Sequence, residues 1–341
     1  MASRDGRERS TMEGAGQRSM KAAVYSRYGS PDVVQIRDVE KVVPKDYEVL
    51  IKVRAASVNP LDWHFMRGTP YFLRIRAGLR KPKDIRLGVD VAGQVDAIGR
   101  NVTQFQPGDE VFGTCHGAFA EYACTSESAL VMKPDNVTFE QAASAPVAAF
   151  AALQGLRDKG QIQPGQKVLI NGAAGGVGTF AVQIAKSFGA DVTGICSTRN
   201  VDMVRSIGAD HVVDYTQEDF TKSGQRYDLF FDGVGNHSLS ACRGVLTPPG
   251  IYIAVGGPSS PWMIGPMARA VTAPVWSRLV SQKLAMVLAK PNQKDLTVVR
   301  DLMEAGKATP VIDKRYRLTG VPEAIRYLEQ GHARGKVVIT L

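Results

Sequence analysis

A run of small residues, Ala173-Ala174-Gly175-Gly176-Val177-Gly178, has the composition of a turn that binds phosphate. The preceding residues 167–171 are apolar, as in a buried parallel strand, and from Val177 to Phe188 apolar residues recur at helical spacing. Between a strand and a helix, small residues let the backbone approach a pyrophosphate, whose charge is stabilised by free N–H groups and the helix dipole. The alternative is an ordinary strand-to-helix turn. The residues predicted to bind a dinucleotide here are Ala174, Gly175, Gly176 and Val177.

The next predicted strand, residues 191–197, ends at the residues that decide which nicotinamide cofactor is bound. An NAD-selective fold carries Asp or Glu about 20 residues beyond the glycines, where the carboxylate binds the ribose 2′-hydroxyl. Here that place holds Ser197, Thr198 and Arg199. A hydroxyl and a guanidinium bind a 2′-phosphate, which a carboxylate would repel. Ser197 and Arg199 therefore favour NADPH, and the alternative is a surface arginine that follows a strand.

The composition is that of a globular protein large enough for two domains. The chain has 341 residues, of which 44% are hydrophobic and 22% are charged. Its four cysteines form no C-x-x-C pair, which fits a reducing compartment, so we expect a cytoplasmic protein. No apolar stretch approaches the roughly 18 residues of a membrane span. Residues 1–19 are polar and lack the apolar stretch of a secretory signal, so we predict a disordered tail or vector sequence, with Met20 as the domain start.

Strand and turn patterns divide the chain into a β-rich part and an alternating part. Many short strands separated by Gly/Pro turns predict a small barrel from Met20 onward. From residue 167 strands alternate with helices, which predicts a doubly wound parallel sheet of six strands, and residues 336–340 return to β character. The predicted barrel strands are 21–27, 33–39, 48–58, 91–98, 109–113 and 118–125. The predicted sheet strands are 167–171, 191–197, 211–214, 227–232, 251–255 and 284–289.

This order of elements and four sequence motifs resemble the medium-chain dehydrogenase/reductase superfamily. The motifs are Asn59-Pro60-Leu61-Asp62, Gly88-Val89-Asp90-Val91-Ala92-Gly93, Gly108-Asp109-Glu110-Val111-Phe112-Gly113 and Gly335-Lys336-Val337-Val338. Within the superfamily the chain is similar to the quinone oxidoreductase group, which includes zeta-crystallin-like proteins and alkenal-reducing relatives. The resemblance covers Met20 to Leu341 apart from residues 258–290.

The resemblance implies an α/β protein of two domains. One is a GroES-like β-barrel catalytic domain formed by residues 20–144 and 308–341. The other is a doubly wound Rossmann NADP-binding domain formed by residues 145–307, with a six-stranded parallel sheet. The resemblance also implies a homodimer, which we expect to form by pairing of the sixth sheet strand, residues 284–289.

Zinc alcohol dehydrogenases of this superfamily hold their catalytic zinc with a Cys, a His-Glu pair and a second Cys or Asp. By resemblance, Asn59 lies in the Cys region and Val89-Asp90 takes the place of the His-Glu pair, and valine cannot coordinate a metal. The four closely spaced cysteines of the structural zinc lobe are absent as well. Cys115-His116 would supply only two ligands. We therefore predict no metal site.

Without zinc, reduction of a conjugated acceptor remains feasible, because hydride can add to an electron-poor carbon while hydrogen bonds stabilise the oxygen that gains charge. The resemblance places Asn59 and Asp62 in the active-site cleft as catalytic residues. Asn59 would donate to a carbonyl oxygen or hold the nicotinamide, and Asp62 would orient its neighbours or a water. The alternatives are an Asn-Pro turn and a helix cap. His64 and Tyr71 are further candidate proton donors, with packing or surface roles as alternatives.

Further cofactor contacts follow from the ends of the predicted strands. Residues after the fourth and fifth sheet strands lie where ligands bind in open α/β sheets. The resemblance implies a tyrosine beside the adenosine phosphate, and two basic residues near the C-terminus either reach the phosphates or form a solvated charge pair. These predicted cofactor-binding residues are Tyr215, Val234, Gly256, Arg334 and Lys336.

The net charge of +9 is unevenly distributed. Residues 74–86 carry six basic residues against Asp84 alone, and residues 258–290 combine prolines with Trp, Met and basic residues. A basic surface beside apolar side chains predicts either peripheral contact with an anionic membrane or, for 258–290, a lid over the substrate pocket. The latter sector also resembles the variable region of envelope-associated plant quinone oxidoreductase homologues. Nucleic-acid binding is not expected, because the basic residues lack aromatic interleaving and a known motif.

These patterns and the resemblance predict a zinc-independent, NADPH-dependent oxidoreductase that transfers hydride to quinones or α,β-unsaturated carbonyls. The alternative is a non-catalytic NADPH-binding scaffold or a membrane-peripheral regulator of the same fold. Turnover distinguishes these two classes of protein.

Overall fold

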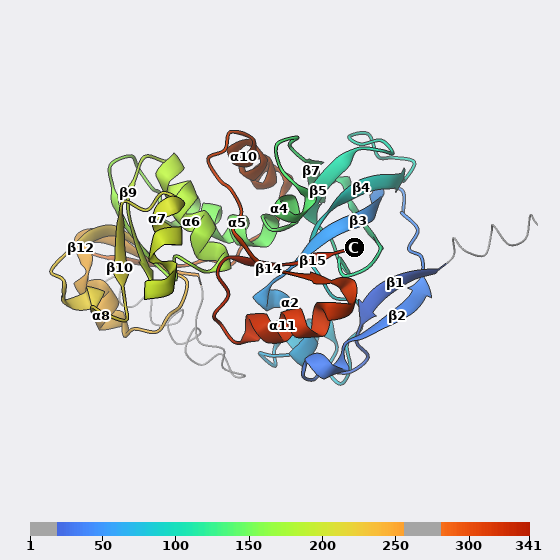
Figure 1. Ribbon diagram of the computed structural model, residues 1–341, viewed down its shortest axis with the longest axis horizontal. Helices are drawn as coiled ribbons and strands as arrows, with labels where there is room; N and C mark the ends of the chain where they lie inside the picture. Colours follow the sequence, from blue (N-terminus) through green and yellow to red (C-terminus); the bar gives the residue numbers. More distant parts are fainter. Residues whose placement is uncertain (1–18, 256–280) are drawn as a thin grey trace, which may run out of the picture.

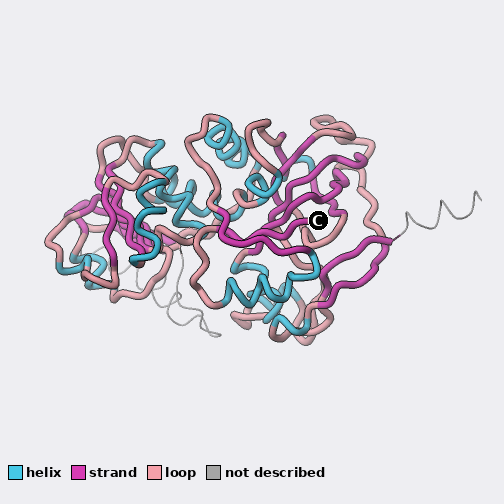
Figure 2. The backbone as a smooth tube through the Cα atoms, in the orientation of Figure 1, coloured by secondary structure: helices cyan, strands magenta, loops and turns pink. Residues whose placement is uncertain are grey.

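The computed structural model describes residues 19–255 and 281–341, which form two lobes (Figures 1 and 2). In one lobe, six short strands form a parallel sheet in the order β10-β9-β8-β11-β12-β13. The strands are β8 (Lys167–Asn171), β9 (Asp191–Cys196), β10 (His211–Asp214), β11 (Tyr227–Asp232), β12 (Leu246–Ala254) and β13 (Lys283–Met286). The chain reverses direction across the sheet at β8, so a crevice lies at the carboxyl ends of the strands beside it.

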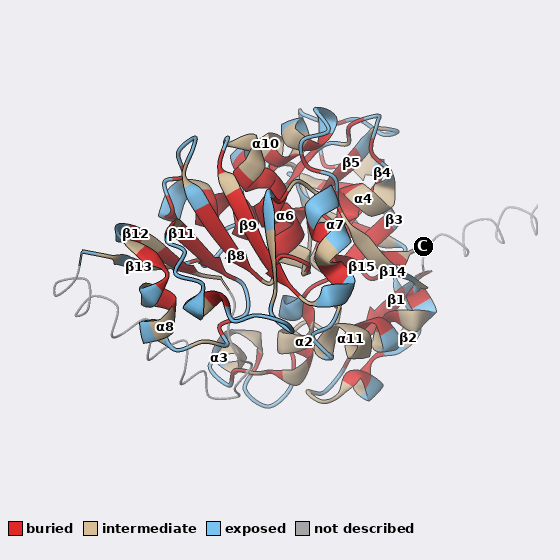
Figure 3. Ribbon diagram, turned by 60° about the vertical axis from the view of Figure 1, so that its left-hand side comes forward, coloured by how far each residue is buried: buried red, intermediate tan, exposed pale blue. Residues whose placement is uncertain are grey.

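Helices cover this sheet because its strands are apolar on both faces (Figure 3). In β8, Val168 and Ile170 pack in one core cluster with Phe180 of α6, whereas Leu169 packs in another with Phe230. This alternation is the pleat of a strand that is buried on both sides. The helices of this part of the chain are α5 (Pro146–Leu153), α6 (Gly176–Ser187), α7 (Val201–Ser206), α8 (Leu239–Gly244) and α10 (Gln293–Glu304), with a π-helical segment, η3 (Gln154–Lys159), after α5.

The other lobe contains a seven-stranded mixed sheet in the order β14-β15-β3-β4-β5-β7, with β6 pairing to β3. Its strands are β3 (Glu48–Val58), β4 (Asp90–Ile98), β5 (Glu110–Thr114), β6 (Tyr122–Ser126), β7 (Leu130–Met132), β14 (Ile312–Arg317) and β15 (Lys336–Thr340). Three helices belong to this lobe beside the sheet, and a fourth, α3, lies on its outer surface. They are α2 (Pro60–Arg67), α3 (Leu73–Ala77), α4 (Phe139–Ala143) and α11 (Val321–Glu329). The predicted fold class, a GroES-like barrel domain with a six-stranded Rossmann domain, is confirmed.

The element bounds differ from the predicted ones in a few places. Residues 118–121 do not continue into β6. They bind the edge of β1 (Ser19–Val24), whose partner is β2 (Gln35–Glu40), and the Ala23 N–H donates to the Phe119 carbonyl (2.8 Å). Ser19, expected in the tail, starts β1, and residues 1–18 lie outside the described residues. The sixth sheet strand ends at Met286 rather than at residue 289.

The predicted domain bounds at 144/145 and 307/308, and the homodimer through the sixth strand, stay predictions. The lid or membrane element expected at 258–290 lies largely outside the described residues, as does Gly256. Among the helices that the structure describes, none has the length and apolar character needed to cross a bilayer.

Candidate active site

The glycine turn between β8 and α6 is a cradle that larger side chains would fill. Gly172 has a φ of +81°, and a Cβ on Gly178 would lie 2.0 Å from the Gly172 carbonyl oxygen. Gly175 is the N-cap of α6, so the first N–H groups of the helix have no partner within it. Free N–H groups and a positive helix end are the features that bind a pyrophosphate, and the predicted residues Ala174–Val177 therefore fit this group.

The segment before β15 lies directly against this turn. The Gly335 N–H donates to the Ala174 carbonyl (2.8 Å), and Gly175 and Gly335 form an isolated parallel bridge. A Cβ on Gly176 would lie 3.1 Å from Cδ of Lys336. The two lobes therefore meet at the cofactor turn, and the start of β15 supports it.

A buried polar cluster lies next to this junction and contains both residues predicted to be catalytic. Asn59 precedes α2, and its amide donates to Asp90 Oδ2 (2.9 Å) and to the Ser57 carbonyl (3.3 Å). Lys336 Nζ donates to Asn59 Oδ1 (2.6 Å) and lies 3.5 Å from Asp90 Oδ2. Both amide hydrogens and the amide oxygen of Asn59 are thus used within the protein. Asn59 therefore positions Asp90 and Lys336 in this arrangement, and its direct contact with a substrate stays a prediction.

Asp90 is the centre of the cluster. Besides Asn59 and Lys336, its carboxylate accepts from the Ser57 hydroxyl (2.8 Å) and from the Val147 N–H (3.0 Å). Val147 lies in the first turn of α5, which has no side-chain cap of its own, so Asp90 takes the role of a capping residue from a distant strand. The carboxylate connects β4 to α5, α2 and β15.

The sequence analysis does not identify Asp90 as a member of the site, and it leaves open a solvated charge pair for Lys336. The resemblance gives Asp90 only as part of the pair that replaces a His-Glu zinc ligand pair. Lys336 is only 3% exposed, so the solvated charge pair weighed for it is wrong; burial lowers the pKa of its amino group, while Asp90 and Asp62 act to raise it. Arg334 is exposed, and its backbone N–H donates to Asp313 Oδ2 (2.9 Å). A usable signal was Asp90 itself, an acidic residue directly before the apolar residues Val91, Ala92 and Gly93 at the start of β4.

Asp62 is buried and also lines a cleft. Its Oδ2 accepts from the Asn59 N–H (2.7 Å), which fixes the first turn of α2. Burial raises the pKa of Asp62 from 3.8 to about 7, against hydrogen bonds from the Asn59 and Gly88 N–H groups that lower it. The cleft beside it has a volume of about 260 Å³. Its lining residues are Tyr25, Asp62, Phe65, Ala77, Lys83, Asp84, Arg86, Leu87, Gly88, Val89 and His116.

The raised pKa of Asp62 makes protein stability depend on pH. Between pH 3.8 and about 7 the folded state holds a proton on this carboxyl that the unfolded state has lost, so this contribution to stability is lost as the pH rises through that range. We expect D62N to flatten the fall in the free energy of unfolding between about pH 4 and pH 7. Urea denaturation of both proteins across this range measures the difference. Parallel pH profiles for the two proteins would contradict the assignment.

The two other candidate proton donors have surroundings that fit supporting roles. His64 Nδ1 lies 2.7 Å from the Thr69 carbonyl, which can only accept, and its ring stacks on Trp63. Burial lowers the pKa of His64, so the neutral ring is favoured at neutral pH. Tyr71 is largely on the surface.

The residues predicted to select NADPH lie together after β9. Arg199 is exposed, and its guanidinium donates to the His332 carbonyl (3.0 Å) in the segment before β15. The amide of buried Asn200 donates to the Ser197 hydroxyl (3.1 Å), but Asn200 Oδ1 has no hydrogen-bond partner among the described residues. An orphaned buried acceptor beside a hydroxyl and a guanidinium is a place that a ligand donor can satisfy. The Tyr215 N–H donates to the Cys196 carbonyl, which places Tyr215 close to these residues. The side chain of Tyr215 is exposed.

The loop after β11 is held rigidly at the crevice. Asp232 accepts from the N–H groups of Val234 (3.0 Å) and Gly235 (2.8 Å), from the Asn171 amide (2.9 Å) and from the Tyr252 hydroxyl (2.7 Å). Val234 is thereby presented at the surface, at the carboxyl end of the sheet where it was predicted to contact the cofactor.

The positions that correspond by resemblance to the zinc ligands of the alcohol dehydrogenases hold other groups in this chain. Within residues 19–255 and 281–341, no three His, Cys, Asp or Glu side chains lie close enough together to hold a metal ion. His116 Nε2 lies 2.9 Å from Asp84, and burial raises the pKa of the Cys115 thiol. The place beside Asn59 and Asp90 is taken by the ammonium group of Lys336.

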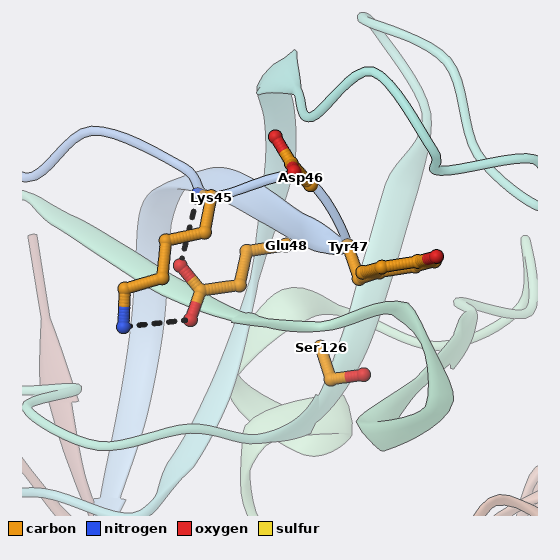
Figure 4. Close-up of a pocket in the computed structure, with 5 residues that line it drawn as sticks. All are labelled: Lys45, Asp46, Tyr47, Glu48 and Ser126. Carbon is orange, nitrogen blue, oxygen red and sulfur yellow. Dashed lines mark hydrogen bonds and ion pairs between the residues drawn. The ribbon is translucent and has the colours of Figure 1, made fainter.

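A second hollow, of about 610 Å³, lies beside the start of β3 (Figure 4). It is lined by Lys45, Asp46, Tyr47, Glu48 and Ser126, and Lys45 pairs with Glu48. Glu48 begins β3 and Asn59 follows its end, so the hollow and the polar cluster lie at opposite ends of this strand. It contributes nothing to the site at the cofactor turn.

Comparisons with known proteins decide the family. Residues 45–135 match the family described as alcohol dehydrogenase GroES-like domain, and residues 207–339 match the one described as zinc-binding dehydrogenase. The chain is 34% identical to the 2-methylene-furan-3-one reductase of Solanum lycopersicum over 94% of this chain and 79% of that protein. It belongs to the medium-chain dehydrogenase/reductase superfamily.

Further relatives place this medium-chain dehydrogenase/reductase within the quinone oxidoreductase group. It is 35% identical to the chloroplastic NADPH-dependent alkenal/one oxidoreductase of Arabidopsis thaliana, over 94% of this chain and 80% of that protein. The solved structure of the quinone oxidoreductase from Coxiella burnetii superposes with a TM-score of 0.82 at 29% identity, covering 95% of this chain and 99% of that one. The protein is an oxidoreductase with a nicotinamide cofactor.

Proposed function

We propose that this medium-chain reductase uses NADPH, without zinc, to reduce quinones or α,β-unsaturated carbonyls. The observation that carries the proposal is the cluster of Asn59, Asp90 and Lys336. Asp90 accepts four hydrogen bonds, and the position facing it is held by an ammonium group, which competes with a divalent cation for the same oxygens. Simple alcohol oxidation then lacks a Lewis acid, whereas a conjugated acceptor can take up hydride without one.

Residues of this chain would bind the cofactor and protonate the reduced substrate. The N-terminal N–H groups of α6 bind the pyrophosphate, while Ser197 and Arg199 bind the 2′-phosphate. When bound, NADPH supplies the hydride. Asp62, whose carboxyl holds a proton near neutral pH, faces the cleft and supplies or relays the proton that completes reduction. The other residues proposed to contact the cofactor are Tyr215, Val234, Gly256 and Arg334, with Lys336 supporting the turn from the barrel side.

Two further expectations remain part of this proposal. A homodimer would form through β13, the last strand of the sheet among the described residues, and the described cysteines are all free, which supports a reducing, cytoplasmic location. The names of the relatives support the chemistry, since those proteins are named as alkenal/one and quinone oxidoreductases.

The test is oxidation of NADPH and NADH by chelator-treated protein, with a simple water-soluble quinone and a short enal as parallel acceptors. We expect turnover with NADPH that survives chelation, and the better acceptor identifies the branch. Tight NADPH binding without turnover on either acceptor would instead favour the non-catalytic scaffold. If the chelator abolishes turnover and added zinc restores it, the proposal of a zinc-independent enzyme is wrong.

A further inference from the structure

Residues 71–85, which we call the α3 segment, expose an unusual amount of apolar surface. Ile75 and Leu79 are 71% and 72% exposed. Three further large side chains of the same segment are also exposed, namely Tyr71, Phe72 and Ile85. Single exposed apolar residues are ordinary, but five within one short segment form a patch, and such patches mark interaction sites. In Figure 3 α3 lies at the lower periphery of the protein, to the left of α2.

The α3 segment is anchored from within, so its outward face is presented by a defined scaffold. Arg74 Nε donates to the Gly68 carbonyl (2.9 Å), and its guanidinium lies over the rings of Tyr28 (4.5 Å) and Tyr71 (4.9 Å). The Tyr28 hydroxyl donates to the Gly78 carbonyl (2.6 Å). These contacts anchor the segment through Arg74, Tyr28 and the ring of Tyr71, and they leave Ile75 and Leu79 exposed.

Positive charge surrounds the apolar patch. Arg80, Lys81 and Lys83 are exposed beside Leu79. Asp84, the single acidic residue of the segment, pairs with Arg86 and His116, which hold the pKa of its carboxyl well below its usual range. The face therefore presents apolar side chains with an excess of cations. A second copy of the same face would meet it with like charge, which disfavours self-association through this surface.

We propose that the α3 segment docks on the surface of an anionic lipid bilayer. Ile75 and Leu79 enter the boundary between headgroups and acyl chains, and Arg80, Lys81 and Lys83 lie at the level of the lipid phosphates. Apolar side chains flanked by cations are the combination that binds such a surface, because burial of apolar area and electrostatic attraction act together.

The docked segment forms a wall of the active-site cleft. Ala77 and Lys83 line the cleft that contains Asp62, so its entrance lies beside the membrane-facing residues. A lipophilic quinone or enone dissolved in the bilayer would then reach the cleft without crossing water. This second step rests on the proposed function, whereas the docking does not.

The docking is tested by flotation of the full chain with vesicles of phosphatidylcholine alone and of equal parts phosphatidylcholine and phosphatidylserine. We expect the protein to float with the anionic vesicles only, and less so as salt is raised. I75E/L79E is expected to abolish flotation, and R80Q/K81Q to weaken binding roughly 25-fold, since each cation near an anionic surface contributes about fivefold. V43E, at an equally exposed apolar residue of another loop, is the matched control and should float like the unmodified protein.

Three results would overturn the docking. They are no flotation with anionic vesicles, flotation of I75E/L79E equal to that of the unmodified protein, or a change of oligomeric state in I75E/L79E that shows the patch to be a self-association surface. The L288E variant tests whether another part of the chain contacts the membrane. Loss of flotation in L288E but not in I75E/L79E would assign the membrane contact to the sector around residue 288. Turnover of a water-soluble quinone without vesicles reports the proposed function separately, and all these variants should retain it.

Discussion

Replacing Lys336 by methionine should lower the free energy of unfolding by about 3–5 kcal/mol, because it leaves the buried carboxylate of Asp90 without its cation. Methionine keeps the aliphatic stem against Gly176, so the loss is mainly that of the charge and of the hydrogen bond to Asn59. Urea denaturation followed by circular dichroism measures the change. K294M, on the exposed face of α10, is the matched control and should stay within about 0.5 kcal/mol of the unmodified protein.

A second variant distinguishes an uncompensated charge from simple loss of packing. If the carboxylate is the cause, K336M/D90N should recover part of the stability lost in K336M, because the buried negative charge is gone. A double variant that is less stable than K336M by the full effect of D90N would show the two side chains to be independent. A K336M protein as stable as the K294M control would refute the role given to the cluster.

Replacing Arg199 by alanine should raise the KM for NADPH by roughly 10- to 100-fold and leave the KM for NADH nearly unchanged. Hydrogen bonds between a guanidinium and a phosphate contribute about 1.5–3 kcal/mol, and NADH lacks the 2′-phosphate that would receive them. Initial rates with both cofactors and one saturating acceptor measure the two values. R205A, at an exposed arginine in the last turn of the neighbouring α7, is the matched control.

The NADPH:NADH ratio is the informative quantity in this experiment. Arg199 also donates to the His332 carbonyl, so its removal loosens the contact between the sheet and the segment before β15. That loosening would weaken both cofactors alike. Equal increases in both KM values would therefore reduce Arg199 to a structural tether and leave Ser197 as the remaining candidate for cofactor selection.

The strands of the parallel sheet were predictable because each is marked by residues that are adjacent in the sequence. Val168, Leu169 and Ile170 are apolar in succession, as a strand buried on both faces must be, and the glycine turn follows them directly. Three of the six strands have the predicted bounds, and the others shift at their ends. One such shift lies at Met286, where β13, the last strand of the sheet among the described residues, ends.

The polar cluster was only half predictable, because its members come from distant parts of the chain. Asn59 and Asp62 share one motif and were found together, but Asp90 and Lys336 lie 246 residues apart and no spacing connects them. The sequence does not predict the pairing of residues 118–121 with β1 for the same reason. An apolar run shows that a strand is present and does not show which partner its edge will take.

The place of β15 in the mixed sheet has a consequence for synthesis on the ribosome. β15 lies between β14 and β3, yet Lys336, its first residue, follows Asn59 by 277 positions. At about 5–20 residues per second, the edge of β3 waits roughly 15–55 s for that partner. During this time the Rossmann sheet can form, while β3 exposes unpaired N–H and C=O groups to other nascent chains. Chaperone dependence and aggregation during expression should therefore arise in the barrel, the lobe that emerges first and is completed last.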